Sequence, residues 1–140
     1  MGAGVIAIGS PACGPACDTT DAANPPQRFE GGTVTGTETL YYTTSDWRTG
    51  LLPFPGGKRY ELVHHLGFAP THVSVYVSFA EQNEPLTPCS GNTCVLQAVR
   101  DDAIIVKNDT CSEFWIRVVA SGPSPNSGDA GVGSDSAATD

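Results

Sequence analysis

Apolar and polar residues alternate along two stretches of the chain, as is typical of β-strands that bury one face. In residues 72–79 the alternation is clearest. Its apolar face consists of Val73, Val75, Val77 and Phe79, and its polar face of His72, Ser74, Tyr76 and Ser78. Residues 114–119 repeat the pattern, with Phe114, Ile116 and Val118 on the inner face. We therefore expect two strands that each turn one face towards a core.

Further strands are expected where the pattern is shorter. Residues 60–65, 95–99 and 103–107 are apolar-rich, and the β-branched, Thr-rich residues 33–42 suit a half-exposed edge strand. Turn residues separate these stretches, and no window has the 3.6-residue period of a helix. The predicted fold class is all-β, an antiparallel β-sandwich of about six to eight short strands.

The same pattern divides the chain into four parts. Residues 28–120 hold the expected strands and form the predicted sandwich domain. Residues 121–140 are rich in Gly, Ser and Pro, with Val132 as the one large aliphatic residue, so they are predicted to form a disordered tail. At the other end we distinguish a signal remnant, residues 1–12, from a linker, residues 13–27.

The net charge of the chain and the positions of its basic residues limit the classes of partner that it can bind. The formal net charge is −8, and the seven basic residues all lie within residues 28–117. Proteins that bind the phosphates of nucleic acids need clustered Lys and Arg, so we expect no nucleic-acid partner. No apolar run approaches the roughly 18 residues that a membrane-spanning helix requires.

The N-terminal residues carry a different signal. Residues 1–12 are uncharged and mildly apolar, and they lead through Ser10, Pro11 and Ala12 to Cys13. Small residues before a cysteine resemble the cleavage point of a bacterial lipoprotein signal, although a basic start and Leu at position 10 are missing. We interpret this segment as the end of a signal that begins upstream; the alternative is an arbitrary N-terminus. A lipid on Cys13 would anchor the protein to a membrane surface, in the cell envelope and outside the cytoplasm.

Five cysteines in so short a chain are typical of secreted proteins, and the odd number leaves one cysteine with a separate fate. Lipidation of Cys13 would account for it. The remaining four permit three pairings. Because residues 89–94 form a short loop with a Gly-Asn turn, we predict a local Cys89–Cys94 disulfide, which leaves Cys17 to pair with Cys111.

Metal sites are a weaker interpretation. The Cys13/Cys17 and Cys89/Cys94 spacings satisfy only the loosest zinc pattern. Neighbouring His64 and His65 point to opposite faces of a strand, so at most one can join His72. The acidic residues that could hold calcium are also explained as turn residues, and they are Asp101, Asp102, Asp109 and Glu113. We predict no metal, no cofactor and, without any assembled catalytic motif, no enzyme activity.

Residues 60–79 resemble a module of small secreted bacterial lipoproteins of unknown function. In these residues a strand, a His/Gly/Pro corner at 65–70 and a second alternating strand precede the closing strand 108–118. The arrangement is also loosely similar to the H-type lectin domain and to some phage tail-fibre domains. The resemblance implies a β-sandwich, but the sugar-contacting residues of the lectin have no counterparts here.

Aromatic residues supply the remaining candidates. Trp115 should face away from Phe114, and an outward ring beside Arg or Asp is how proteins stack against sugars and hydrogen-bond them. The predicted ligand-binding residues are Trp115, Arg117, Tyr76 and His72, and the other rings considered are Tyr41, Tyr42 and Trp47. We expect a non-catalytic recognition module that binds glycans, with self-association to raise avidity. The alternatives are a structural or assembly protein of the cell envelope, and rings that cover a sheet or a subunit contact.

Overall fold

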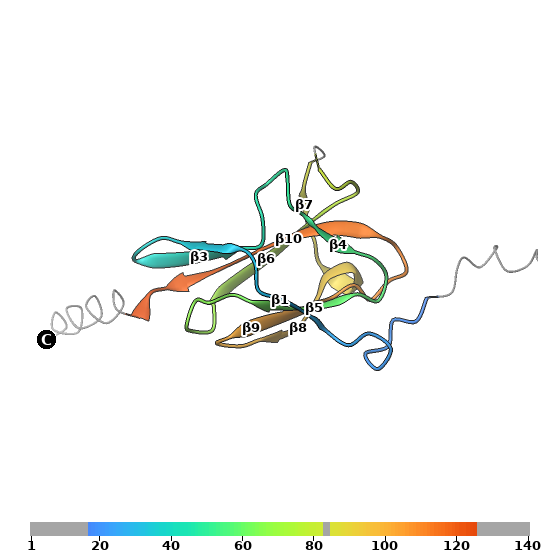
Figure 1. Ribbon diagram of the computed structural model, residues 1–140, viewed down its shortest axis with the longest axis horizontal. Helices are drawn as coiled ribbons and strands as arrows, with labels where there is room; N and C mark the ends of the chain where they lie inside the picture. The colour runs from blue at the N-terminus through green and yellow to red at the C-terminus, as the bar shows by residue number, and fades with distance from the viewer. Residues whose placement is uncertain (1–16, 83–84, 126–140) are drawn as a thin grey trace, which may run out of the picture.

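Two sheets pack face to face in the computed structural model, which describes residues 17–82 and 85–125 (Figure 1). The four-stranded sheet has the order β1 (Gln27–Phe29), β5 (Arg59–Val63), β9 (Ala103–Lys107) and β8 (Val95–Val99). The six-stranded sheet has the order β2 (Thr33–Thr35), β3 (Thr39–Thr43), β10 (Phe114–Pro123), β6 (His72–Ser78) and β7 (Thr87–Pro88), and β4 (Leu52–Phe54) also pairs with β10. A short 3₁₀ turn, Gly91–Cys94, directly precedes β8.

The predicted fold class is confirmed, with two differences. The described residues contain ten strands rather than six to eight. Residues 33–42, expected as one strand, form the antiparallel pair β2 and β3 with a turn at Gly36 between them, and β1, β4 and β7 have only two or three residues each. A strand of that length turns at most two side chains to either face, so alternation cannot reveal it. The pairing is also not wholly antiparallel, since β1 runs parallel to β5.

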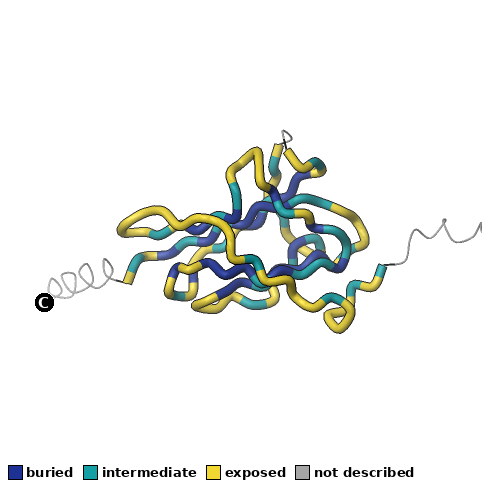
Figure 2. Tube along the Cα trace, in the orientation of Figure 1, coloured by how far each residue is buried: buried dark blue, intermediate teal, exposed yellow. Residues whose placement is uncertain are grey.

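The core lies between the inner faces of the sheets, where the buried parts of the tube concentrate (Figure 2). In the six-stranded sheet Val77 lies opposite Ile116 and Val75 opposite Val118, so the alternating faces expected from the sequence meet in register. The other sheet contributes four side chains that are at most 2% exposed, and these are Tyr60, Leu62, Ile104 and Val106.

One expected core residue lies outside. Phe79 is 80% exposed, although the alternation places it on the apolar face of β6. The strand ends at Ser78, so the two-residue period no longer fixes the direction of the next side chain. The Phe79 ring instead contacts Phe114, with 5.5 Å between ring centroids.

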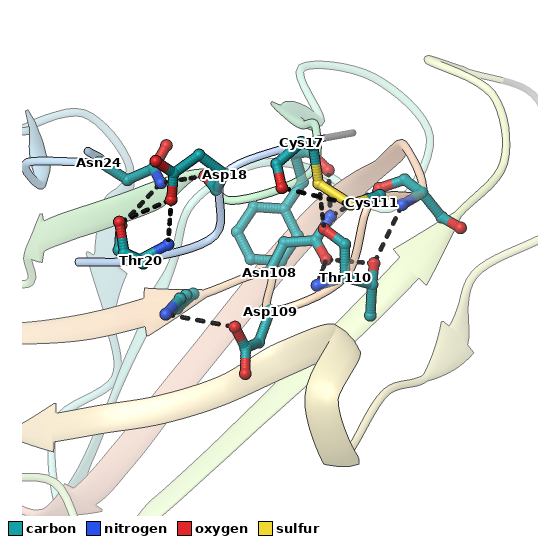
Figure 3. Close-up of a disulfide and its surroundings, with 11 residues drawn as sticks. Cys17, Asp18, Thr20, Asn24, Asn108, Asp109, Thr110 and Cys111 are labelled. Atoms are coloured by element: carbon teal, nitrogen blue, oxygen red, sulfur yellow. Dashed lines mark hydrogen bonds and ion pairs between the residues drawn. A yellow bond between two sulfur atoms is a disulfide. The ribbon is translucent and has the colours of Figure 1, made fainter. Parts of the chain in front are cut away.

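Both predicted disulfides are present. Cys89–Cys94 closes a local loop, and Cys17–Cys111 joins residues 94 apart in the sequence (Figure 3). Asn108 organises the loop that carries Cys111: its Nδ2 donates to the carbonyl oxygens of Phe54 and Ser112, and its Oδ1 accepts from Thr110. Asn108 is wholly buried, so the Asn-Asp-Thr sequence at 108–110 is a structural turn and not an accessible glycan acceptor.

Part of the segment predicted as a linker lies against the sandwich. The Asp21 carboxylate accepts from Lys107 Nζ at 3.0 Å and from the Gln97 amide at 3.2 Å. Asn24 caps the turn by donating to the carbonyl oxygens of Asp18 and Thr20. We call residues 17–24 the N-terminal strap.

The ends of the sequence are only partly described. β10 continues to Pro123, because Ser121–Pro123 pair with β3, so the first residues of the expected tail belong to the sheet. Residues 1–16, which include Cys13, and residues 126–140 lie outside the described residues.

The two disulfides should contribute unequally to stability. In the chain-entropy treatment a cross-link contributes more as the loop it closes lengthens, about 4–5 kcal/mol for a loop near 100 residues and about 2 kcal/mol for one near five. We expect the Cys17→Ser/Cys111→Ser variant to lose more free energy of unfolding in urea than the Cys89→Ser/Cys94→Ser variant. Equal losses would show that the strap and its loop are already held together in the unfolded chain.

The strap should loosen in acid. The hydrogen bond from Lys107, with a further one from Gln97, holds the pKa of Asp21 below its ordinary value. A carboxylate with a lowered pKa stabilises the fold when ionised, and this contribution is lost as the pH falls below about 4. Asp21→Asn should therefore lower the free energy of unfolding near neutral pH, and its difference from the wild type should shrink as the pH falls below about 4.

Asp101→Asn is the matched control, because Asp101 lies exposed in the turn between β8 and β9. The free energy of unfolding of Asp101→Asn should differ little from that of the wild type, both near neutral pH and in acid. If the free energy of unfolding of Asp21→Asn stays as far below that of the wild type in acid as near neutral pH, the ionised carboxylate does not stabilise the strap.

Candidate functional site

The candidate site arises where one edge of β10 changes partner. Residues 114–116 of β10 pair with β4, and residues 119–123 pair with β3. The segment that joins β3 to β4, residues 44–51, therefore projects from the sheet (Figure 1), and we call it the arch. Thr44 begins the arch and replaces the missing strand, since its N–H donates to the carbonyl of Val118 and its hydroxyl accepts from the N–H of Val118.

The arch folds back over Arg117. The carbonyl of Ser45 accepts from Arg117 Nε at 2.8 Å, and the Trp47 ring lies 3.8 Å from the guanidinium carbon. Gly50, with φ of +76°, allows the chain to turn back towards β4. Tyr76 lies opposite Arg117 on β6 and meets the Trp47 ring edge to face, with 5.1 Å between centroids. The arch, β10 and β6 thus bring Trp47, Arg117 and Tyr76 into one cluster.

The charge of Arg117 is incompletely compensated. Arg117 is only 7% exposed, and its Nη1 is buried without a hydrogen-bond partner in the part of the chain that the structure describes. Burial lowers the pKa of Arg117, while nearby Tyr76 and Asp46 oppose the shift. A buried donor without an acceptor is costly, and in native proteins it is commonly completed by a water or a ligand.

A polar hollow of about 300 Å³ lies at the base of the arch. Its walls carry the side chains of Thr33, Thr43, Thr44, Ser45, Asp46 and Thr49, and Gly32 and Gly50 complete it. The Asp46 side chain is exposed, and its carboxylate forms no hydrogen bond or ion pair with any other described residue. Trp47 belongs to the same arch, next to Asp46 in the sequence, and its ring has 53% of its surface accessible.

The four predicted ligand-binding residues share the outer face of the six-stranded sheet but do not form a single group. Arg117 and Tyr76 are directly paired, whereas His72 lies four residues along β6, about 13 Å away. Trp115 is half-buried between Pro53 and Ser78. Trp47 replaces these two as the third member of the cluster. The sequence around Trp47 does not alternate between apolar and polar residues, because Trp47 lies in the arch and not on a strand.

A second, more apolar groove of about 710 Å³ lies between the edges of the two sheets. Val73 and Val75 of β6 form one side, Val95 and Leu96 of β8 the other, and the Cys89–Cys94 disulfide closes one end. Strand β7 covers only residues 76 and 77 of β6, so the rest of that edge borders the groove.

The histidines do not gather. His64 is wholly buried, and its ring accepts from the N–H of Leu66 and lies 2.9 Å from the carbonyl of Arg100, which gives it a structural role. His65 and His72 are exposed. Within residues 17–82 and 85–125, no three His, Cys, Asp or Glu side chains form a group that suits a metal ion.

No protein-family model, curated protein or solved structure matches the chain. No helix in the described part is long and apolar enough to cross a membrane. The assignment of a function therefore rests on the geometry of the arch, the hollow and the groove.

Proposed function

We propose that this protein is a non-catalytic recognition module of the cell envelope that binds glycans at the arch. The observation that carries the proposal is the half-exposed Trp47 ring, held against Arg117 in the same arch whose residues Ser45, Asp46 and Thr49 line the polar hollow. An aromatic platform next to hydrogen-bonding side chains is the arrangement that binds sugars, because a sugar ring has both an apolar face and many hydroxyl groups.

The rigidity of the platform supports this role. Trp47 is fixed by Arg117 on its face and by Tyr76 at its edge, and both partners belong to strands of the central sheet. A preorganised ring loses little conformational entropy when a ligand binds. A binding role also agrees with the titratable residues, since His64 is used in the core and Asp21 and Lys107 hold the strap.

The envelope location rests on the cysteines. Two disulfides in a small domain are typical of proteins that fold outside the reducing cytoplasm. Cys17 is bonded to Cys111 of the sandwich, so a lipid on Cys13 would tether the sandwich through the disulfide-bonded strap.

An assembly protein of the envelope is the second candidate function. The observation that favours it is the apolar groove, where Leu96 is 40% exposed and part of the β6 edge lacks a neighbouring strand. Such an edge can accept an extended segment of another protein by strand addition. On this alternative the protein would bind no sugar and would co-purify with a partner or self-associate.

Binding to a glycan array tests the first candidate. We expect the described sandwich to bind sugars and Trp47→Ala to weaken this binding about tenfold or more, as when an aromatic anchor is removed from an interface. Phe79→Ala is the control, because Phe79 is another exposed ring but lies outside the cluster. If no sugar on the array binds and the protein sediments as a monomer, both glycan binding and avidity through self-association are excluded.

The lipid anchor has its own test. Mass spectrometry of the mature protein from its native membrane should find an N-terminus at Cys13 that carries a lipid. An unmodified Met1, or a free thiol at Cys13, would contradict the anchor and leave the glycan proposal in place.

A further inference from the structure

Two charged groups at the arch lack a complementary partner within the described residues. Arg117 Nη1 is a buried donor without an acceptor, and the exposed Asp46 carboxylate is an acceptor without a donor. The two residues lie near each other, because Arg117 donates through Nε to the carbonyl of Ser45, the residue before Asp46. Asp46 also lies close enough to Arg117 to oppose the lowering of its pKa.

Only some chemical groups suit both residues. A carboxylate would complete Arg117 but would be repelled by Asp46, and an ammonium would complete Asp46 but would be repelled by Arg117. A hydroxyl accepts one hydrogen bond and donates another, so it can bind Arg117 and Asp46 together without adding charge. The threonine and serine residues that line the hollow make it polar, which also suits a ligand with several hydroxyl groups.

We infer, on the basis of the proposed glycan binding, that the arch selects a neutral sugar unit, with one hydroxyl between Arg117 and Asp46 and the apolar face of the sugar on Trp47. The hollow of about 300 Å³ is of the size that holds a small ligand. The formal net charge of −8 acts in the same direction, because it repels acidic polysaccharides at a distance.

Trp47 should report the binding of a sugar. Its ring lies against the Arg117 guanidinium, so a sugar that binds Arg117 and stacks on the ring changes the surroundings of the indole. Trp47 and Trp115 are the two tryptophans of the chain, and a Trp115→Phe background assigns the fluorescence to Trp47 alone. We expect saturable changes in this fluorescence with a neutral sugar.

Titration with three sugars of one ring type tests the selectivity. We would follow the NMR spectrum of the protein with the methyl glycosides of a neutral hexose, the corresponding uronic acid and the corresponding hexosamine. The neutral glycoside should bind about tenfold more tightly than the charged ones. Asp46→Asn should weaken its binding about tenfold, the usual effect of losing a hydrogen bond to a charged group.

Asp101→Asn is the control, because it removes the same charge from an exposed turn of the other sheet. It should leave binding unchanged, and circular dichroism should show both variants folded. Preference for the uronic acid or the hexosamine would overturn the inference and leave glycan recognition standing. The inference would also be overturned, and glycan recognition left standing, if Asp46→Asn binds the neutral glycoside as tightly as the wild type while Trp47→Ala binds it more weakly. Absence of binding to every sugar would overturn glycan recognition and the inference together.

Discussion

The arrangement of the six-stranded sheet depends on how β10 shares one of its edges between β4 and β3. Neither strand pairs with residues 117 and 118, and Val118 is wholly buried, so its backbone groups need partners from elsewhere. Thr44 supplies both, one through its backbone and one through its hydroxyl. Once Thr44 is fixed in this way, the following residues have no place in the sheet and must project as the arch. The candidate site is therefore a direct consequence of completing the backbone hydrogen bonds of a core strand.

The same gap explains why a cation is buried on this face. Arg117 lies on the outer side of β10, between the two strands that share the edge, and the arch covers it. The Ser45 carbonyl and the Trp47 ring offset part of the desolvation of the guanidinium. Arg117 Nη1 is buried without a hydrogen-bond partner among residues 17–82 and 85–125, whereas the backbone groups of β10 and β6 beneath it are paired in register. Incomplete polar groups beside an exposed ring are more typical of binding surfaces than of structural supports.

Sequence patterns revealed those features that depend on local chemistry. The alternation of residues 72–78 and 114–119 predicts β6 and much of β10, and the count and spacing of the cysteines predict both disulfides. Strands β1, β4 and β7 carry no detectable period because each has only two or three residues, and no alternation marks the turn that divides residues 33–42 into β2 and β3. The sequence marks Trp47 only as an aromatic residue and does not single out Asp46, because their positions depend on the pairing of β10 with strands distant in sequence. The role of Asn108 was likewise hidden, since its partner Phe54 lies 54 residues away.

Asn108 also connects the strap, through which the proposed lipid would tether the protein, with the arch. Its side chain holds the loop of Cys111, to which Cys17 is bonded, and donates to Phe54 of β4, the strand that ends the arch. A lipid at Cys13, as proposed, would thus be connected to the arch through the Cys17–Cys111 disulfide and the hydrogen bonds of Asn108. Single sugar sites of this size bind weakly, and many copies on one membrane would raise the effective concentration of sites. With such a tether, avidity would not require a stable oligomer, so the membrane could supply what self-association was expected to provide.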